Sequence, residues 1–346
     1  MTRHRSACVS LVVLALLGAP SLTHAAPWIV NSANDVDDGA CNATHCSLRE
    51  AIKAANSNQG ADEIRFSVGS GAAIIKPTSQ LPSVDGPTLI DGTTQPGYAG
   101  APLIEINGQL AGNVSGLVFA LSNSSTIVGL AIDGFAKDGV RFGSRQGSLG
   151  ANAIRASYIG LGHLGQPGLG NGVGVHLTRS YDNIIGGPNA ADGNVISGNG
   201  IGVLLEGCDG VVRHNYVGTT PSGAASLANG TGIVLEHGGI QLDDNVISGN
   251  RTHGVSAFRA SGLLAHHNLI GVGADAVSAI GNGGAGIFLD GGSDTAYIGA
   301  NTIAHNGSHG IDLPSAYRVH ITTNSMFDNA GKGISLSSAP VTPNDP

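Results

Sequence analysis

Short runs of alternating apolar and polar residues, separated by glycine and asparagine, dominate the second half of the chain. The clearest unit reads N-x-I-x-x-N and then, a few residues later, G-I-x-L, as in NVISGNGIGVLL from Asn194. The alternation gives each run a single apolar face, which is the pattern of a strand with one buried side. Glycine and asparagine tolerate the left-handed backbone of tight corners, so they mark the ends of the runs.

The unit returns at a regular period along the chain. The leading asparagines are Asn194, Asn215, Asn245, Asn268, Asn301 and Asn324. Their gaps are 21, 30, 23, 33 and 23 residues. Self-similarity at this period, with strand residues and no helical stripe, predicts a solenoid whose coils stack about 4.8 Å apart. We expect the leading asparagines to form an internal ladder that satisfies the corner amides.

The repeats resemble those of pectin-lyase-like proteins over about residues 85–336. The resemblance implies an all-β fold, a right-handed parallel β-helix solenoid, and it implies no particular reaction. More degenerate copies, such as LAIDGFAKDGVRF from Leu130, extend the pattern well before Asn194. Residues 337–346 form a C-terminal tail with no recognisable cap, and this favours a truncated chain over an exposed last coil.

The first residues have the pattern of a secretory signal peptide. Arg3 and Arg5 precede the short apolar run 9–17, and the segment 23–25 supplies the small residues of a cleavage site. We therefore expect residues 1–25 to be removed and the protein to be secreted or displayed at the cell surface. The apolar run is too short to span a bilayer, and no later segment is a better candidate.

The region 26–84 has a different pattern, which predicts a short capping helix. In CSLREAIKAAN, from Cys46 to Asn56, Ser47 and Glu50 form a capping box ahead of an apolar helical stripe. Such a helix would cover the apolar end and open strand edge of the first coil. The hexapeptide CSLREA also resembles the signature of CSLREA-domain proteins. That resemblance implies export and a β-helix body, and it supplies no catalytic residues.

Cysteines and acidic residues add three smaller expectations. Cys41 and Cys46 close a small loop and are predicted to form a disulfide in an oxidising compartment. Cys208 has no basic neighbour to lower its pKa, so a buried, unreactive thiol is expected. The acidic turn Asn34–Gly39 lacks the ligand pattern of a calcium loop, and we expect it to be solvated.

Composition narrows the range of partners. The formal net charge is −8, and losing Arg3 and Arg5 with the leader takes it to −10. An acidic chain without a basic patch is a poor partner for nucleic acid or anionic lipid. The 55 glycines and the 4% aromatic content suit a β-solenoid better than an ordinary globular domain.

The main candidate for chemistry is a group of charged pairs, one directly before each of three consecutive leading asparagines. They are Arg213-His214, Asp243-Asp244 and His266-His267. The first member of each pair follows an inward apolar residue, so it should face outward, about 5 Å from its neighbour on the next coil. This proximity would suit acid–base catalysis or a transition metal. The alternative is a surface charge ladder in which opposite charges neutralise each other.

A second row of acids follows the G-I-x-L strands: Glu206, Glu236 and, beyond Phe258, Asp290. Stacked carboxylates repel each other unless a cation lies between them or one of them has a raised pKa. Calcium is therefore the candidate ion for this row, although we expect no required cofactor. No lysine or arginine is in register with the row to abstract a proton, and a solvated row is the simpler interpretation.

Three matching insertions occupy residues 158–177, 216–235 and 269–289. We expect them to emerge as loops on one side, two coils apart, forming either a binding face or tolerated surface loops. Tyr158 and Tyr216 lie beside them and are candidates for stacking on sugar rings.

These patterns predict an exported, monomeric scaffold that binds an extracellular polysaccharide or a cell-surface protein. The alternative is a polysaccharide lyase or glycoside hydrolase that uses the charged pairs, although the motif sets of polygalacturonases and of DPH-type epimerases are not assembled in the sequence. A third hypothesis is that the chain is a stalk fragment of a larger surface protein.

Overall fold

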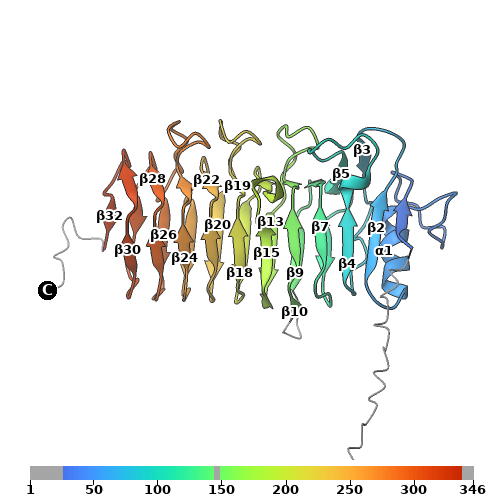
Figure 1. Cartoon of the computed structure of the whole chain (residues 1–346), viewed down its shortest axis with the longest axis horizontal. Coiled ribbons are helices and arrows are strands. Elements are labelled where there is room, and N and C mark those ends of the chain that lie inside the picture. The colour runs from blue at the N-terminus through green and yellow to red at the C-terminus, as the bar shows by residue number, and fades with distance from the viewer. Residues whose placement is uncertain (1–25, 144–148, 337–346) are drawn as a thin grey trace, which may run out of the picture.

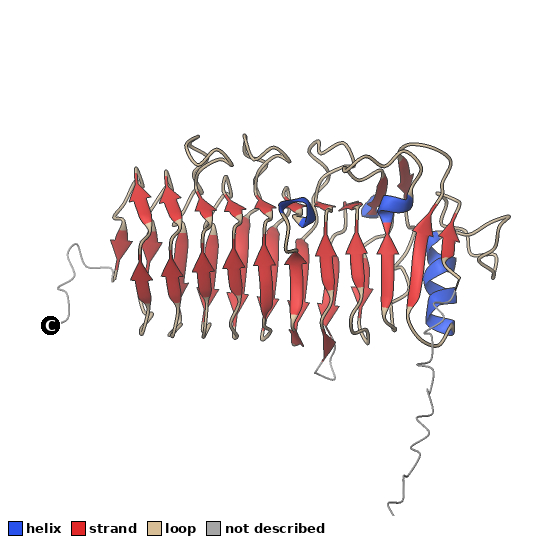
Figure 2. Ribbon diagram, in the orientation of Figure 1, coloured by secondary structure: helices blue, strands red, loops and turns tan. Residues whose placement is uncertain are grey.

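The computed structural model describes residues 26–143 and 149–336, which form a parallel β-helix. Three long sheets run along the solenoid, and each coil contributes one strand to each of them over most of its length (Figures 1 and 2). Every pair of named strands in the described residues is parallel, as in Ile233 with Val255. The all-β solenoid predicted from the repeats is therefore confirmed.

Sheet A contains, in spatial order, β1 (Trp28–Val30), β2 (Asp62–Phe66), β4 (Thr88–Asp91), β7 (Thr126–Val128), β11 (Ala153–Arg155), β15 (Asn183–Gly186), β18 (Gly210–Arg213), β21 (Gln241–Asp243), β24 (Leu264–His266), β27 (Tyr297–Gly299) and β30 (His320–Thr322). Sheet B contains β3 (Ala73–Ile75), β5 (Ile104–Asn107), β8 (Leu130–Asp133), β12 (Tyr158–Ile159), β16 (Val195–Ile196), β19 (Tyr216–Val217), β22 (Val246–Ile247), β25 (Leu269–Ile270), β28 (Thr302–Ala304) and β31 (Ser325–Phe327).

Sheet C contains β6 (Leu117–Phe119), β9 (Asp138–Gly143), β13 (Val173–Thr178), β17 (Ile201–Glu206), β20 (Thr231–Glu236), β23 (Val255–Phe258), β26 (Ile287–Asp290), β29 (Ile311–Asp312) and β32 (Ile334–Ser335). A separate pair joins β10 (Leu149–Gly150) to β14 (Ser180–Tyr181). The helices are α1 (Leu48–Ser57) and the single 3-10 turns η1 (Gly92–Thr94), η2 (Gly108–Leu110) and η3 (Ala190–Asp192).

The core is a stack of aliphatic side chains from the inward positions of all three sheets. Val203, Ile233 and Val255 are register partners on β17, β20 and β23, and none of them is exposed. Removing such columns from water is the main favourable contribution to folding. Because each coil contacts only its neighbours, the same inward residue types recur from coil to coil.

The six leading asparagines form the ladder expected from the repeat. The side-chain amide of each donates to the Oδ1 of the next, with Nδ2–Oδ1 distances of 2.9–3.0 Å. The second asparagine of the short units and the asparagine of the Asn-Gly pair that ends each insertion form a parallel ladder, which was not predicted from the sequence. It links Asn171, Asn199, Asn229, Asn250, Asn282, Asn306 and Asn329.

Helix α1 covers the first coil, as the capping pattern predicted, and it lies at the N-terminal end of the solenoid in Figure 1. The Ser47 hydroxyl accepts a hydrogen bond from the Glu50 amide, and the Glu50 carboxylate accepts one from the Ser47 amide 2.9 Å away. The expected disulfide joins Cys41 to Cys46. Cys208 is free and buried, and burial raises the pKa of its thiol to about 12.

The acidic turn ahead of α1 is exposed at Asn34 and from Val36 to Gly39, as expected, but Asp35 is partly buried and bonded to the helix. The Asp35 carboxylate accepts two hydrogen bonds from the Arg49 guanidinium, at 3.0 and 2.8 Å, and one from the Thr78 amide at 2.8 Å. Asp37 pairs with Lys53. These ion pairs fasten the turn to the helix that covers the solenoid.

The three insertions emerge between sheets B and C, on alternate coils, along one edge of the solenoid (Figure 1). Successive loops also touch each other. The Ala274 amide of the third loop donates to the Gly223 carbonyl of the second at 3.1 Å, and Gly165 of the first lies against Pro221 of the second. The loops therefore form a continuous ridge.

Two expectations concern residues outside the described ranges: the signal peptide at 1–25 and the truncated tail at 337–346. None of the helices in residues 26–143 and 149–336 has the length and hydropathy of a membrane-spanning segment.

We predict that Asn245→Ala destabilises the solenoid by about 3 kcal/mol or more. Asn245 is fully buried, and its amide bonds the Val212 carbonyl and the Asn268 Oδ1, while its own Oδ1 accepts from Asn215. Alanine would leave several buried groups unsatisfied, at about 1–3 kcal/mol each. Urea unfolding followed by circular dichroism measures the loss. Asn113→Ala, at an exposed position, is the control, and equal stability of the two variants would contradict the ladder's role.

Candidate functional site

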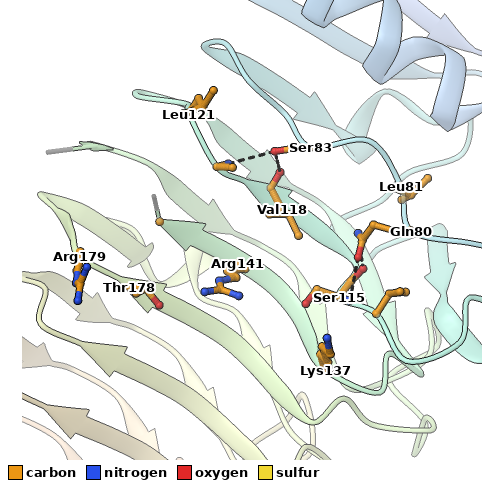
Figure 3. Close-up of a pocket in the computed structure, with 13 residues that line it drawn as sticks. Gln80, Leu81, Ser83, Ser115, Val118, Leu121, Lys137, Arg141, Thr178 and Arg179 are labelled. Carbon is orange, nitrogen blue, oxygen red and sulfur yellow. Dashed lines mark hydrogen bonds between the residues drawn. The ribbon is translucent and has the colours of Figure 1, made fainter. Parts of the chain in front are cut away.

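A groove of about 670 Å³ lies over the N-terminal part of sheet C (Figure 3). One wall is the extended segment 80–83, and the floor and opposite wall come from β6, β9, β13 and the turns beside them. Its lining consists of Gln80, Leu81, Ser83, Val114, Ser115, Val118, Ala120, Leu121, Lys137, Arg141, Gly143, Thr178 and Arg179.

The groove exists because the edge of sheet C is covered by an extended segment in place of another strand. The Gln80 Nε2 donates to the Ser115 carbonyl at 2.8 Å, and the Gln80 Oε1 accepts from the Ser115 backbone amide. Further along, the Val84 amide donates to the Val118 carbonyl at 2.8 Å. These side-chain and backbone bonds cover the edge strand and protect it from pairing with other chains.

Three cations lie along this groove: Lys137, Arg141 and Arg179. In Figure 3, Arg141 lies near the middle, Lys137 towards one end and Arg179 towards the other. No acidic residue is among the described residues that line it. The lining of the groove is therefore positively charged, although the chain as a whole is acidic. The expectation that the chain has no basic patch does not hold for this groove. A concave surface of one charge attracts ligands of the opposite charge.

Beside the groove, His176 bridges two carboxylates on neighbouring strands. Its Nδ1 lies 3.1 Å from the Asp138 Oδ1, and its Nε2 lies 2.8 Å from the Glu206 Oε2. The Ser115 hydroxyl, in the groove wall, donates to the other Asp138 oxygen at 2.9 Å. Arg141 completes the network, 4.0 Å from Asp138.

The network favours a protonated histidine between ionised acids. Burial alone would lower the pKa of His176, yet its hydrogen bonds to Asp138 and Glu206 raise it above the ordinary value. Burial would likewise raise the pKa of Asp138, but the hydrogen bond and charge of His176 hold it below the usual range. Both ring nitrogens of His176 are hydrogen-bonded, so His176 holds Asp138 and Glu206 in position and places a positive charge beside the groove. For the same reason it is poorly placed to take a proton from a ligand.

The charged pairs predicted from sequence lie on sheet A, away from this groove. Arg213, Asp243 and His266 are register partners on β18, β21 and β24, as the alternation implied. Asp243 and Arg213 do not form an ion pair. Instead, the Oδ1 of Asp243 lies 3.3 Å from the Nδ1 of His267. The second members occupy left-handed corners, and the Nε2 of His214 lies 3.7 Å from the Asp244 Oδ2.

The second predicted row is only partly assembled. Glu206 and Glu236 are register partners, and Phe258 separates Glu236 from Asp290. Because His176 bonds Glu206, that end of the row contacts a cationic side chain that the sequence analysis did not pair with it.

The two predicted stacking residues, Tyr158 and Tyr216, lie on sheet B under the loop ridge. Gly165 of the first loop approaches the Tyr158 ring, and Gly223 of the second approaches the Tyr216 ring. Both rings are half-buried, and the loops pack against them. Only part of each ring is therefore open to solvent.

A third polar cluster, not predicted from sequence, fixes the first loop. The Glu105 Oε2 lies 2.7 Å from the His163 Nδ1, and the Asp133 carboxylate accepts from the Leu169 amide and the Asn107 side chain. Burial raises the pKa of Asp133, and the nearby charge of Glu105 adds to the effect. Only the tertiary path of the loop brings His163 to Glu105, 58 residues away.

Comparison with known proteins supports the fold. A family model described as a right handed beta helix region matches residues 222–344. A search of curated proteins gives no significant match. The chain resembles the periplasmic alginate epimerase AlgG with a TM-score of 0.54 and 15% identity, covering 77% of this chain and 60% of the epimerase. The chain thus spans less than two thirds of that protein's length.

Two further solved structures are less similar. The A-module of the mannuronan C-5 epimerase AlgE6 from Azotobacter vinelandii has a TM-score of 0.48 and 12% identity, covering 85% of this chain and 95% of the module. The surface protein and adhesin PfbA of Streptococcus pneumoniae has a TM-score of 0.42 and 10% identity, covering 90% and 99%. At such identities the likeness concerns the fold alone: a right-handed parallel β-helix.

We predict that His176 stabilises the protein in a pH-dependent way. A group whose pKa is raised on folding contributes fully below its unfolded value, about 6.5, and loses the contribution as pH rises through the folded value. The stability difference between wild type and His176→Gln should therefore be largest near pH 5–6 and shrink above pH 6.5.

Urea unfolding of both proteins across this pH range measures the difference. His237→Gln, at an exposed corner, is the matched control and should show no such trend. A stability difference between wild type and His176→Gln that grows with rising pH would contradict a protonated His176 between Asp138 and Glu206.

Proposed function

We propose that this protein is an exported β-helix scaffold that binds an acidic polysaccharide in the groove over sheet C. The observation that carries the proposal is the row of three cations, Lys137, Arg141 and Arg179, in a groove without acidic lining among its described residues. The signal-peptide pattern of residues 1–25 and the CSLREA resemblance support export.

The groove also has the other properties of a sugar site. Ser83 and Thr178 contribute hydroxyls to the lining, and Val118 and Leu121 offer apolar surface for the faces of sugar rings. An open trough over stacked strands suits an extended polymer better than a compact ligand. Carboxylates or sulfates on the polymer would pair with the guanidinium groups, which bind such anions through two parallel hydrogen bonds.

A polysaccharide lyase or glycoside hydrolase is the second candidate. It is favoured by the carboxylates of Asp138 and Glu206 beside the same groove, with His176 holding them in place and not acting as the base, and it agrees with the fold likeness to an alginate epimerase. A binder retains the polymer unchanged, whereas an enzyme releases unsaturated products or new reducing ends.

We predict that the protein retains a polyuronate but not a neutral glucan of similar length, and that Arg141→Ala weakens binding about 10-fold. Losing one charge-assisted hydrogen-bond pair costs about 1.4 kcal/mol, which is a factor of ten in Kd. Affinity should also fall with added salt, because exposed charges are screened. Fluorescence anisotropy with a labelled polyuronate measures both effects.

Arg251→Ala removes an exposed arginine outside the groove and is the matched control. Equal binding by Arg141→Ala and wild type, or equal retention of the neutral glucan, would contradict the proposal. Assaying the same mixtures for unsaturated ends and reducing ends separates binding from turnover.

A further inference from the structure

We infer that the corner column formed by Asp243, Asp244 and His267 on sheet A is a binding site for a divalent transition-metal ion, separate from the groove. One donor atom from each of these three residues lies within 4.8 Å of the other two. The column runs along the rim between sheets A and B, where the two aspartates and the histidine belong to adjacent coils.

The donor set matches the chemistry of such an ion. The Nδ1 of His267 lies 3.3 Å from the Oδ1 of Asp243. Around a tetrahedral Zn²⁺ with bonds of about 2.1 Å, ligand atoms lie about 3.4 Å apart. Imidazole together with carboxylate suits zinc and its neighbours, whereas calcium prefers an all-oxygen set with more ligands.

A second observation comes from His214, one coil before Asp244. Its Nδ1 lies 2.9 Å from the Gly187 carbonyl oxygen, which can only accept a hydrogen bond, so Nδ1 carries the proton. The Nε2 is left facing the Asp244 carboxylate at 3.7 Å. A backbone carbonyl on the distal ring nitrogen is the arrangement that orients histidines for metal binding. His214 is therefore presented as a further donor at the Asp244 side.

The backbone beneath the column is held in place by the asparagine ladder. Asp244 and His267 directly precede Asn245 and Asn268, which are fully buried and bonded to each other at 2.9 Å. Ligands on a rigid scaffold lose little freedom on binding, which favours a defined site. The same corner holds Ala300 and Thr323 on the following coils, so the donors are confined to this part of the column.

The adjoining row also has unsatisfied polar atoms. The Nε2 of His266 and the Nε of Arg213 are buried without a hydrogen-bond partner among the described residues. Such atoms are uncommon in folded proteins, and water or a bound ion is among the partners that can account for them. Arg213 contributes one positive charge and the two aspartates two negative charges, so carboxylates outnumber the cationic Arg213 in the column, which favours a bound cation.

Isothermal titration of the tag-free full chain with Zn²⁺ tests the site, with Ca²⁺ as the comparison ion. We expect one Zn²⁺ per chain, at least 10-fold tighter than Ca²⁺. The variants Asp243→Asn and His267→Gln should each weaken Zn²⁺ binding 10- to 100-fold. Visible absorption of the Co²⁺-loaded protein, altered by both variants, provides a direct readout of coordination.

His237→Gln is the matched control, because His237 is an exposed corner histidine with the same left-handed backbone on sheet C. Thermal melts of the metal-free variants check that they fold, and Asp244→Asn serves as a second isosteric variant. Absence of a stoichiometric Zn²⁺ site, or equal weakening by His237→Gln, would overturn the inference and leave a surface ion-pair column. Arg141→Ala should bind Zn²⁺ as wild type does, so the metal site and the groove can fail independently.

Discussion

The structure depends on satisfying buried amides where the chain turns between parallel strands. Each coil makes its corners inside the stack, so the peptide groups there have no access to water, and leaving them unpaired costs about as much as a lost hydrogen bond or more. Two columns of asparagine meet this demand, each side chain bonding the coil before and the coil after. Stacking coils therefore reinforce one another, and the corner positions become rigid supports for whatever stands outside them.

The N-terminal region has a comparable role at the end of the stack. Helix α1 covers the first coil, and the acidic turn is fastened to it through Asp35 and Arg49. The chain then runs past the edge of sheet C, where Gln80 and Ser83 bond the edge strand with their side chains. The same segment forms one wall of the basic groove, so protection of the edge and formation of the candidate site have one structural cause.

The distribution of charge gives the solenoid two distinct surfaces. The chain is acidic overall, yet its cations on the first part of sheet C face a trough, while sheet A presents a column of histidine and aspartate. The acidic surface outside the groove repels anionic ligands, whereas the three cations in the groove attract them. An anionic ligand is therefore directed to the groove and away from non-specific contacts. The ridge of loops lies between these surfaces, and Glu105 and Asp133 bond the backbone of its first loop.

The sequence alone determined the solenoid, its inward faces, the leading asparagine ladder, the capping helix and the Cys41–Cys46 pair, because each rests on local spacing that recurs or on a contact a few residues long. It also placed Arg213, Asp243 and His266 in register, since their distance from a ladder asparagine is constant. It did not find the groove: Lys137, Arg141 and Arg179 lie on degenerate coils, where the repeat is too weak to fix the register between β6, β9 and β13. Likewise, Asp138, His176 and Glu206 meet across 30 and 38 residues, a contact set by the lengths of the intervening loops. Only the tertiary structure decides contacts of that kind, because they depend on how far each coil travels before it returns to the sheet.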